Sequence, residues 1–265
     1  MRFGIKTGAN EFFYLDEEKI KEWGIEKRFL KPVIKSPREC KKILIDPSDL
    51  KYKIFMCHED KKDLKGTNAL EYIKWGEEQK FNLRPTLLSK TAWWQIEFDV
   101  GEFLWWKSIG ERYCFFWNRE KIPVDQRNYY IKIKEQHKSE IKARDLVLSL
   151  NSTIDRLFIE ANAREMTGSY TIIELPVEDV ARKKFIFINF EKSDDLDKIL
   201  HRNIVNINEE ITMQDRRNLD SVIFDALNLT KGEREAVYEA VIDLVEARLK
   251  KAGSLDRQGI EEEEE

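Results

Sequence analysis

The stretch "FLWWKSIGERYCFFWNREKIPVDQRNYYIKI", residues 103–133, decides the fold class of this chain. Its aromatic and β-branched residues stand in short runs, and residues of these types favour strands. Turn-forming pairs, Ile109-Gly110 and Ile122-Pro123, separate the runs. Short strands with such turns between them predict an antiparallel sheet. The tryptophans of this region are expected in the core rather than as stacking platforms: Trp93, Trp94, Trp105, Trp106 and Trp117.

On the carboxyl side of this sheet the apolar period becomes helical, beginning with "ARDLVLSLNSTIDRLFIEANAR" (143–164). One more strand, "YTIIEL" (170–175), precedes a mostly helical remainder. The last helix begins at a capping box, Thr230 to Glu233, and carries an apolar stripe typical of a packing face. That stripe consists of Val237, Val241, Leu244, Val245 and Leu249. The expected fold is α+β, with a mixed, largely antiparallel sheet, flanking helices and a helical C-terminal part.

On the amino side, residues 2–15 predict a strand, a glycine-rich turn within "GIKTGANEFFYL" (4–15) and a second strand. The segment "KRFLKPVIKSPRECKK" (27–42) then carries seven basic residues and one acidic residue. Within it, Ser36 and Glu39 form a capping box with Pro37 at the first helical position. A helix start among basic side chains suits phosphate. A solvated, charged face is the alternative that the sequence leaves open.

The composition is that of a folded and strongly charged protein, with 42% hydrophobic and 36% charged residues among 265. The chain carries a net charge of −4 and ends in five glutamates, so residues 257–265 are expected to form a disordered acidic tail. Three widely spaced cysteines predict a reducing, cytoplasmic location. No apolar run has the length of a membrane span, so no membrane partner is expected.

Few sequence features point to catalysis. The chain has no Gly-x-Gly fingerprint for a nucleotide cofactor, no P-loop, and no metal-binding spacing around its three histidines. One acidic pattern has the layout of metal-dependent nucleases: Asp49, an apolar strand, then Glu59 and Lys61. A magnesium-dependent nuclease that uses these three residues is therefore an alternative function, although so short a pattern arises easily by chance.

Four stretches, taken in order, resemble one known family. They are "GIKTGANEFFYL" (4–15), "FLKPVIKSPREC" (29–40), "LVLSLNSTIDRLFIE" (146–160) and "RRNLDSVIFDALNLTKGEREAVYEAVIDLVEARLKKA" (216–252). Together they are similar to the region after the catalytic domain in type IIG-like N6-adenine DNA methyltransferases of restriction-modification systems. The resemblance implies that the chain is the C-terminal target-recognition, or specificity, region of such an enzyme.

The resemblance also implies a division of the chain. The family's glycine-rich S-adenosylmethionine loop and its (Asn/Asp)-Pro-Pro-(Tyr/Phe) motif are not found in this sequence. No cofactor is therefore expected on this chain, and S-adenosylmethionine is expected on a catalytic domain or subunit that it lacks. Residues 1–45 are expected to link to that catalytic lobe, 46–190 to form the target-recognition domain, and 191–256 to form a helical region. The expected partners are double-stranded DNA and the catalytic domain.

Basic and amide side chains are the expected DNA contacts, because Lys and Arg bind phosphates whereas Arg and Asn read base edges. Contact with phosphate or with the catalytic lobe is expected from the opening loop through Lys6, Thr7 and Asn10. The alternative is a turn in which the Asn10 side chain bonds its own backbone. Phosphate contacts are expected from Lys31, Lys35 and Arg38, and with less weight from Lys41 and Lys42. The expected base readers are Arg112, Arg119, Arg127 and Asn128. A protein-interaction module, in which the 230–252 helix docks on a partner and no DNA binds, is a further alternative.

Overall fold

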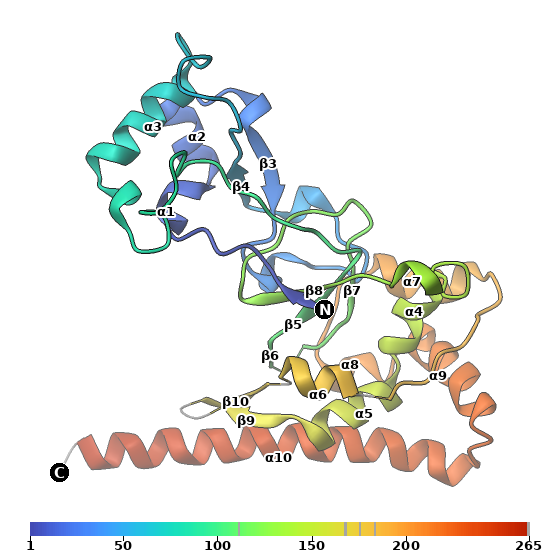
Figure 1. Ribbon diagram of the computed structural model, residues 1–265. Helices are drawn as coiled ribbons and strands as arrows, with labels where there is room; N and C mark the ends of the chain where they lie inside the picture. Colours follow the sequence, from blue (N-terminus) through green and yellow to red (C-terminus); the bar gives the residue numbers. More distant parts are fainter. Residues whose placement is uncertain (111, 167–168, 175, 183, 264–265) are drawn as a thin grey trace.

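The computed structural model confirms the α+β fold class (Figure 1). It describes residues 1–110, 112–166, 169–174, 176–182 and 184–263. The strands are β1 (Arg2–Phe3), β2 (Tyr14–Leu15), β3 (Leu30–Val33), β4 (Tyr52–Phe55), β5 (Phe103–Trp106), β6 (Ser108–Ile109), β7 (Phe116–Trp117), β8 (Asn128–Ile131), β9 (Arg164–Met166) and β10 (Ser169–Glu174). The helices are α1 (Asn10–Phe13), α2 (Glu17–Trp23), α3 (Asn68–Glu78), α4 (Ala143–Leu150), α5 (Thr153–Asn162), α6 (Val177–Arg182), α7 (Asp194–His201), α8 (Ile207–Glu210), α9 (Gln214–Ala226) and α10 (Lys231–Glu263).

The described strands form three antiparallel sheets, in the orders β1-β8-β5-β7, β2-β4-β3 and β6-β10-β9. In the first sheet, β5 pairs with β8 so that Trp105 lies opposite Tyr129. The stretch 103–133 supplies β5, β7 and β8 of this sheet, which confirms the antiparallel sheet predicted there. The strand predicted at 170–175 corresponds to β10, although its last residue, Leu175, lies outside the described residues.

Two large hydrophobic clusters divide the molecule (Figure 1). The first spans residues 5–96 and lies in the upper part of the figure, around α1, α3 and β4. The second gathers residues 103–223 together with apolar side chains from 34–45. Residues 1–45 thus contribute to both cores, whereas the division expected from the sequence has its boundaries at 45 and 190. The roles expected for those segments stay predictions.

The tryptophans lie in these cores, as expected. Trp93 and Trp94 are buried in the first cluster, and Trp105 and Trp106 in the second. Trp117 is half-buried and packs against the second cluster. The aromatic strands therefore serve packing, which leaves the polar side chains at their ends as the candidates for binding.

The opening region, residues 2–15, departs from the predicted strand, turn and strand. β1 and β2 belong to different sheets, and the helical turn α1 lies between them. This turn lets both Phe12 and Phe13 be fully buried, and Phe12 stacks on Tyr72 with ring centroids 4.6 Å apart. Gly8 has a φ of +76°, and a Cβ added there would lie 2.8 Å from the Thr86 Cβ, so this position requires glycine.

The capping box predicted at Ser36 is confirmed, but it opens a very short helical turn. The capping box is present, because the Ser36 hydroxyl accepts from a backbone N–H while the Glu39 carboxylate accepts from the Ser36 N–H at 2.9 Å. The turn covers only Pro37–Glu39, however, and extended backbone follows at Cys40. Glu39 also accepts from the Lys51 N–H at 3.1 Å, which ties the turn to a later segment. So short a turn has no helix dipole with which to hold a phosphate.

The last helix, α10, runs along the base of the molecule against α5 and β10 (Figure 1). It begins at the predicted capping box, with the Thr230 N–H donating to the Glu233 carboxylate at 2.7 Å. Val241 and Val245 of the predicted stripe are buried, as expected for a packing face, whereas Leu244 of the same stripe is 38% exposed. The helix continues to Glu263, into the segment for which disorder is expected. Within the described residues, no helix combines the length and apolar content needed to cross a membrane.

Buried polar groups fix the helices next to the sheet. The Asn151 amide donates to the carbonyls of Phe115 and Val147, both at 2.8 Å, and accepts from the Phe115 N–H at 2.9 Å. Asp220 of α9 accepts from the N–H and the hydroxyl of Thr153, at 2.8 and 2.6 Å. Burial raises the pKa of Asp220 above its ordinary value. The "LNST" run (150–153) therefore joins the sheet, α5 and α9 through side-chain hydrogen bonds.

We expect Asn151→Ala to lower the free energy of unfolding by about 2–4 kcal/mol, because it leaves the buried Phe115 N–H and C=O without partners. Urea unfolding followed by far-UV circular dichroism measures this loss. The control is Asn162→Ala, at an exposed position at the end of α5. A loss for Asn151→Ala no larger than that of the control would contradict this role.

A second buried network surrounds Glu210 of α8. Its carboxylate accepts from Arg202 at 2.6 and 2.9 Å and from Arg216 at 3.0 and 2.7 Å. Burial alone would raise the pKa of Glu210, but the charge of Arg216 and the hydrogen bonds from Arg202 outweigh burial and lower this pKa to about 2. The network ties α8 to α9 and to the end of α7.

The lowered pKa predicts sensitivity to acid. Because the pKa of Glu210 in the folded protein lies below its ordinary value of 4.5, its stabilisation is complete above that pH and is lost as the pH falls toward 2. At roughly 1.4 kcal/mol per pKa unit, the loss reaches about 3 kcal/mol. Urea unfolding between about pH 6 and pH 3 should show this slope in the parent and a flatter slope in Glu210→Gln. Glu239→Gln, at an exposed position on α10, should keep the parental slope.

Candidate nucleic-acid interface

Four of the residues expected to contact DNA line a single cleft of about 840 Å³. Arg38 comes from the turn after Ser36, Arg112 from the loop after β6, and Arg127 and Asn128 from the start of β8. Backbone bonds bring these segments together, since the Ile34 N–H donates to the Pro123 carbonyl and the Asp125 N–H to the Ile34 carbonyl, both at 2.9 Å. Trp106 of β5 and Leu249 of α10 add apolar surface to the cleft.

Asn128 lies in the wall of this cleft and is 2% exposed. Among the described residues, neither its amide nitrogen nor its amide oxygen has a hydrogen-bond partner. Its backbone is well held, because its N–H donates to the Asp125 carbonyl at 3.0 Å and its carbonyl accepts from the Gly4 N–H at 3.1 Å. Both amide atoms are buried, so the Asn128 side chain is enclosed behind the wall of the cleft rather than exposed on it.

Arg127 is fixed by Asp125, which is 1% exposed. The Asp125 carboxylate accepts from the Arg127 N–H and Nε, both at 3.0 Å, and from the Tyr14 hydroxyl at 2.9 Å. The Arg127 guanidinium also donates to the Lys35 carbonyl at 3.1 Å. Burial and the neighbouring Asp125 carboxylate raise the pKa of Tyr14, so its hydroxyl stays protonated and donates to Asp125. The result is a guanidinium held in one orientation with its side chain largely exposed.

The other two arginines of the cleft are differently placed. Within the described part of the chain, the guanidinium groups of Arg38 and Arg112 have no hydrogen-bond or ion-pair partner. None of the described residues that line the cleft carries a carboxylate. Two positive charges, those of Arg38 and Arg112, therefore line the cleft without a paired carboxylate, while Arg127 is paired with Asp125; this charge favours an anionic ligand.

The buried polar side chain of the opening loop, Thr7, makes its hydrogen bonds within the loop itself. Thr7 is 1% exposed, and its hydroxyl donates to the Asn10 side chain and accepts from the Ala9 N–H at 3.2 Å. The loop is therefore a turn, but it is closed by the Thr7 hydroxyl and not by Asn10 bonding its own backbone, which was the alternative. Lys6 and Asn10 are exposed. Their contact with DNA or with a catalytic lobe stays a prediction, and for Thr7 such a contact would require the turn to open.

The remaining candidates lie outside the cleft. Lys31 is exposed on the edge strand β3, and Lys35 is half-buried with its ammonium 3.7 Å from the centre of the Tyr52 ring. Arg119 is exposed and follows β7, whereas Arg112 precedes it, so the two lie at opposite ends of that strand. Lys41 and Lys42 form ion pairs with Asp49 and Asp46, both at 3.3 Å. Their contacts with DNA stay predictions.

The nuclease pattern does not assemble into a site. Asp49 precedes β4 and pairs with Lys41, whereas Glu59 follows β4 and pairs with Arg28 at 2.8 Å. Lys61 binds the Glu77 carboxylate at 2.5 Å and so is not available to orient water. Over the part of the chain that the structure describes, no three histidine, cysteine or carboxylate side chains converge as a metal site. Nothing in the geometry favours the nuclease alternative.

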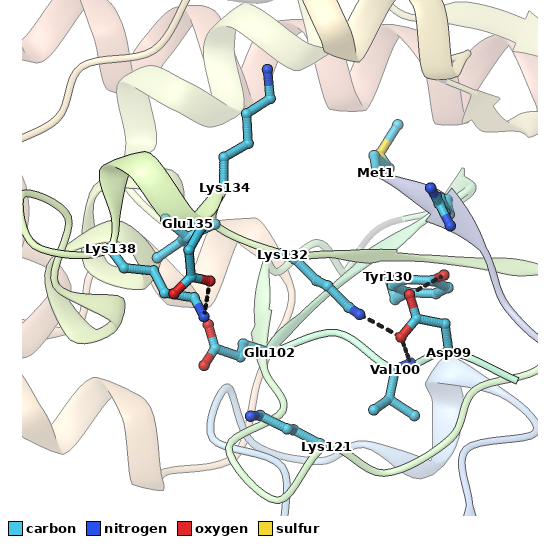
Figure 2. A pocket seen from close by; sticks show the side chains of 12 residues that line it. Met1, Asp99, Val100, Glu102, Lys121, Tyr130, Lys132, Lys134, Glu135 and Lys138 are labelled. Atoms are coloured by element: carbon cyan, nitrogen blue, oxygen red, sulfur yellow. Dashed lines mark hydrogen bonds and ion pairs between the residues drawn. The ribbon is translucent and has the colours of Figure 1, made fainter.

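A second charged cleft, of about 640 Å³, was not expected from the sequence (Figure 2). It lies beyond the other end of β8, where Lys132 pairs with Asp99 and the Tyr130 hydroxyl donates to Asp99 at 3.2 Å. Lys138 pairs with Glu135 at 2.6 Å. The alternating lysines of "IKIK" (131–134) are the signal that could have predicted it. Lys132 and Lys138 are thus paired with carboxylates of this cleft, whereas Lys121 and Lys134 also line it and have no ion pair among the described residues (Figure 2).

Comparison with known proteins defines the class of this chain. Residues 1–215 match the family described as "Type II methyltransferase M.Eco57I, C-terminal domain". The chain belongs to this family, which confirms the resemblance found in the sequence motifs.

Two further proteins are similar to parts of this chain or share its fold. The type II methyltransferase M.AccI of Acinetobacter calcoaceticus is 26% identical over 169 residues, which cover 61% of this chain and 31% of that protein. The type IIG restriction endonuclease BpuSI shares the fold, with a TM-score of 0.60 at 12% identity over 95% of this chain and 30% of that one. The chain thus spans about a third of the length of each relative.

The Asp125 contacts predict a graded loss of stability. Asp125→Ala removes the shared acceptor and leaves the buried Tyr14 hydroxyl unpaired, so we expect a loss of about 2–3 kcal/mol in the free energy of unfolding. Tyr14→Phe removes one hydrogen bond and should cost about 1 kcal/mol. The double variant should lose less than the sum, because both changes remove the same bond. Strict additivity in urea unfolding would show that the two groups do not interact.

Proposed function

We propose that this chain recognises the target sequence of double-stranded DNA for an N6-adenine methyltransferase of a restriction-modification system. The observation that carries this proposal is the convergence of Arg38, Arg112, Arg127 and Asn128 on one cleft, in a chain of a type II methyltransferase family. Guanidinium groups bind phosphates and guanine edges through paired N–H donors, and this donor geometry suits DNA better than most other polyanions.

Arg38 and Arg112 would make a different kind of contact with DNA from Arg127. Arg38 and Arg112 have no partners among the described residues, so they would neutralise phosphates and position the duplex. Arg127 is already oriented by Asp125, and a pre-oriented side chain loses less rotamer entropy on binding. We assign Arg127 to a directional contact with a base or phosphate at the mouth of the cleft.

Methyl transfer belongs, in this proposal, to a catalytic domain outside these residues. That domain would hold S-adenosylmethionine and the everted target adenine, because an adenine inside the duplex cannot be reached by the donor. The exposed Lys6 and Asn10 are the proposed contacts with it. The proposed setting of the whole enzyme is the cytoplasm, where the three cysteines would stay reduced, and all three are buried free thiols here.

A salt titration of duplex binding tests the proposal. The chain is titrated into a fluorescent pool of random-sequence duplexes, and log Kd is plotted against log salt concentration. Affinity should fall steeply with salt, and Arg38→Ala and Arg112→Ala should each weaken binding and reduce the slope by about one. Lys21→Ala, at an exposed position on α2, is the matched control and should behave like the parent.

Two results would contradict this function. One is the absence of binding at low salt even after the catalytic domain of a relative is added. The other is a salt slope that Arg38→Ala, Arg112→Ala and Lys21→Ala leave equally unchanged, which would place DNA away from the cleft.

A further inference from the structure

Two lysines meet at one end of the sheet formed by β2, β4 and β3. Val33 of β3 pairs with Tyr52 of β4 in antiparallel register. Lys35, two residues after Val33, and Lys51, directly before Tyr52, therefore come to the same end of the sheet. Their ammonium groups lie 3.7 and 5.4 Å from the centre of the Tyr52 ring. An aromatic face attracts cations, so Tyr52 holds these two positive charges near each other.

This lysine pair is not neutralised by the fold. Within the part of the chain that the structure describes, neither ammonium group has a hydrogen-bond or ion-pair partner. Two acids stand near the pair in the sequence, and both are engaged elsewhere. Glu39 accepts from the backbone N–H groups of Ser36 and Lys51, at 2.9 and 3.1 Å, and Asp49 pairs with Lys41 at 3.3 Å. Two like charges held by one ring favour an anion beside them.

The lysine pair adjoins the arginine-lined cleft. Arg127, which lines that cleft, donates to the Lys35 carbonyl at 3.1 Å. Arg38, also of the cleft, follows Lys35 by three residues, so their Cα atoms are at most about 11 Å apart. Tyr52 packs against the first hydrophobic cluster, whereas Trp106 of the cleft belongs to the second. The positive surface therefore crosses the junction between the two cores.

We propose that a duplex bound at the cleft continues across this junction, with a backbone phosphate held by Lys35 and Lys51. The inference rests on the proposed function and adds the first core to the DNA-binding surface. Phosphates of one strand follow at about 3.4 Å along the duplex axis, so about 11 Å corresponds to roughly three nucleotides beyond Arg38. An ammonium group has three N–H donors, so it can face a ring and still donate to phosphate. Tyr52 is then a positioning residue that holds both lysines in place.

The experiment is a salt titration of the whole chain with random-sequence duplexes. Lys35→Ala and Lys51→Ala should each weaken binding and reduce the slope of log Kd against log salt concentration by about one. Tyr52→Leu removes the ring but neither charge, so it should weaken binding about two- to fivefold and leave the slope unchanged. Tyr52→Phe keeps the ring and should bind like the parent. Lys21→Ala is the matched control, and a cooperative thermal transition confirms that each variant is folded.

Three results overturn the inference. The first is a parental slope and affinity in both Lys35→Ala and Lys51→Ala while Arg38→Ala and Arg112→Ala reduce the slope, which leaves DNA recognition at the cleft intact. The second is equal binding by Tyr52→Leu and Tyr52→Phe, which removes the positioning role of the ring. The third is the absence of duplex binding by the parent, which overturns the proposed function as well. The first and third results separate failure of this inference from failure of the proposed function.

Discussion

The rest of the structure depends on one buried carboxylate, that of Asp125. This carboxylate accepts from the hydroxyl of Tyr14, in the first core, at 2.9 Å. The backbone N–H of Asp125 donates to the carbonyl of Ile34, in the second core, also at 2.9 Å. A buried charge is tolerated only when hydrogen bonds replace its water, and here Tyr14 and Arg127 provide them. Because Arg127 and Asn128 follow directly in the chain, the group that joins the two cores also sets the position of the candidate interface.

The C-terminal helices support the opposite wall of the same cleft. Arg248 of α10 and Arg156 of α5 both pair with Glu160, at 3.2 and 2.5 Å, and all three side chains are almost fully buried. Both arginines also donate to the Gly110 carbonyl at 3.3 Å, in the loop that leads to the cleft arginine at position 112. Leu249, the next residue of α10, lines the cleft. This buried ion network therefore holds α10 and α5 against the loop that leads to Arg112. The packing of α10 thereby helps to set the shape of the cleft.

The parts of this fold that could be predicted from sequence are those with local causes. The aromatic strands around residues 103–131 and the capping box at Thr230 follow from propensity and hydrogen-bonding pattern within a few residues. The helical turn at 10–13 could not, because it depends on Phe12 stacking on Tyr72, sixty residues away. For the interface, residue types could be predicted but not their convergence. Arg112 and Arg119 look equivalent in sequence, yet they lie on either side of β7, and Arg112 lines the cleft whereas Arg119 does not.

The candidate interface contains charged and polar groups that the fold itself does not pair. An unpartnered buried amide such as that of Asn128 costs about 1–3 kcal/mol. Arg38 and Arg112, which line the same cleft without an ion-pair partner among the described residues, repel one another. Elsewhere the chain pairs such groups closely, as Glu210 with two arginines and Asn151 with two strand groups show. Unsatisfied buried polar atoms also occur away from the cleft, for example Asn82 Oδ1 and Asp145 Oδ2, so the feature of this cleft that points to a ligand is the unpaired positive charge of Arg38 and Arg112. A ligand that stabilises this cleft must therefore carry negative charge. The position of these two arginines defines the ligand more narrowly than the basic composition of the surface does.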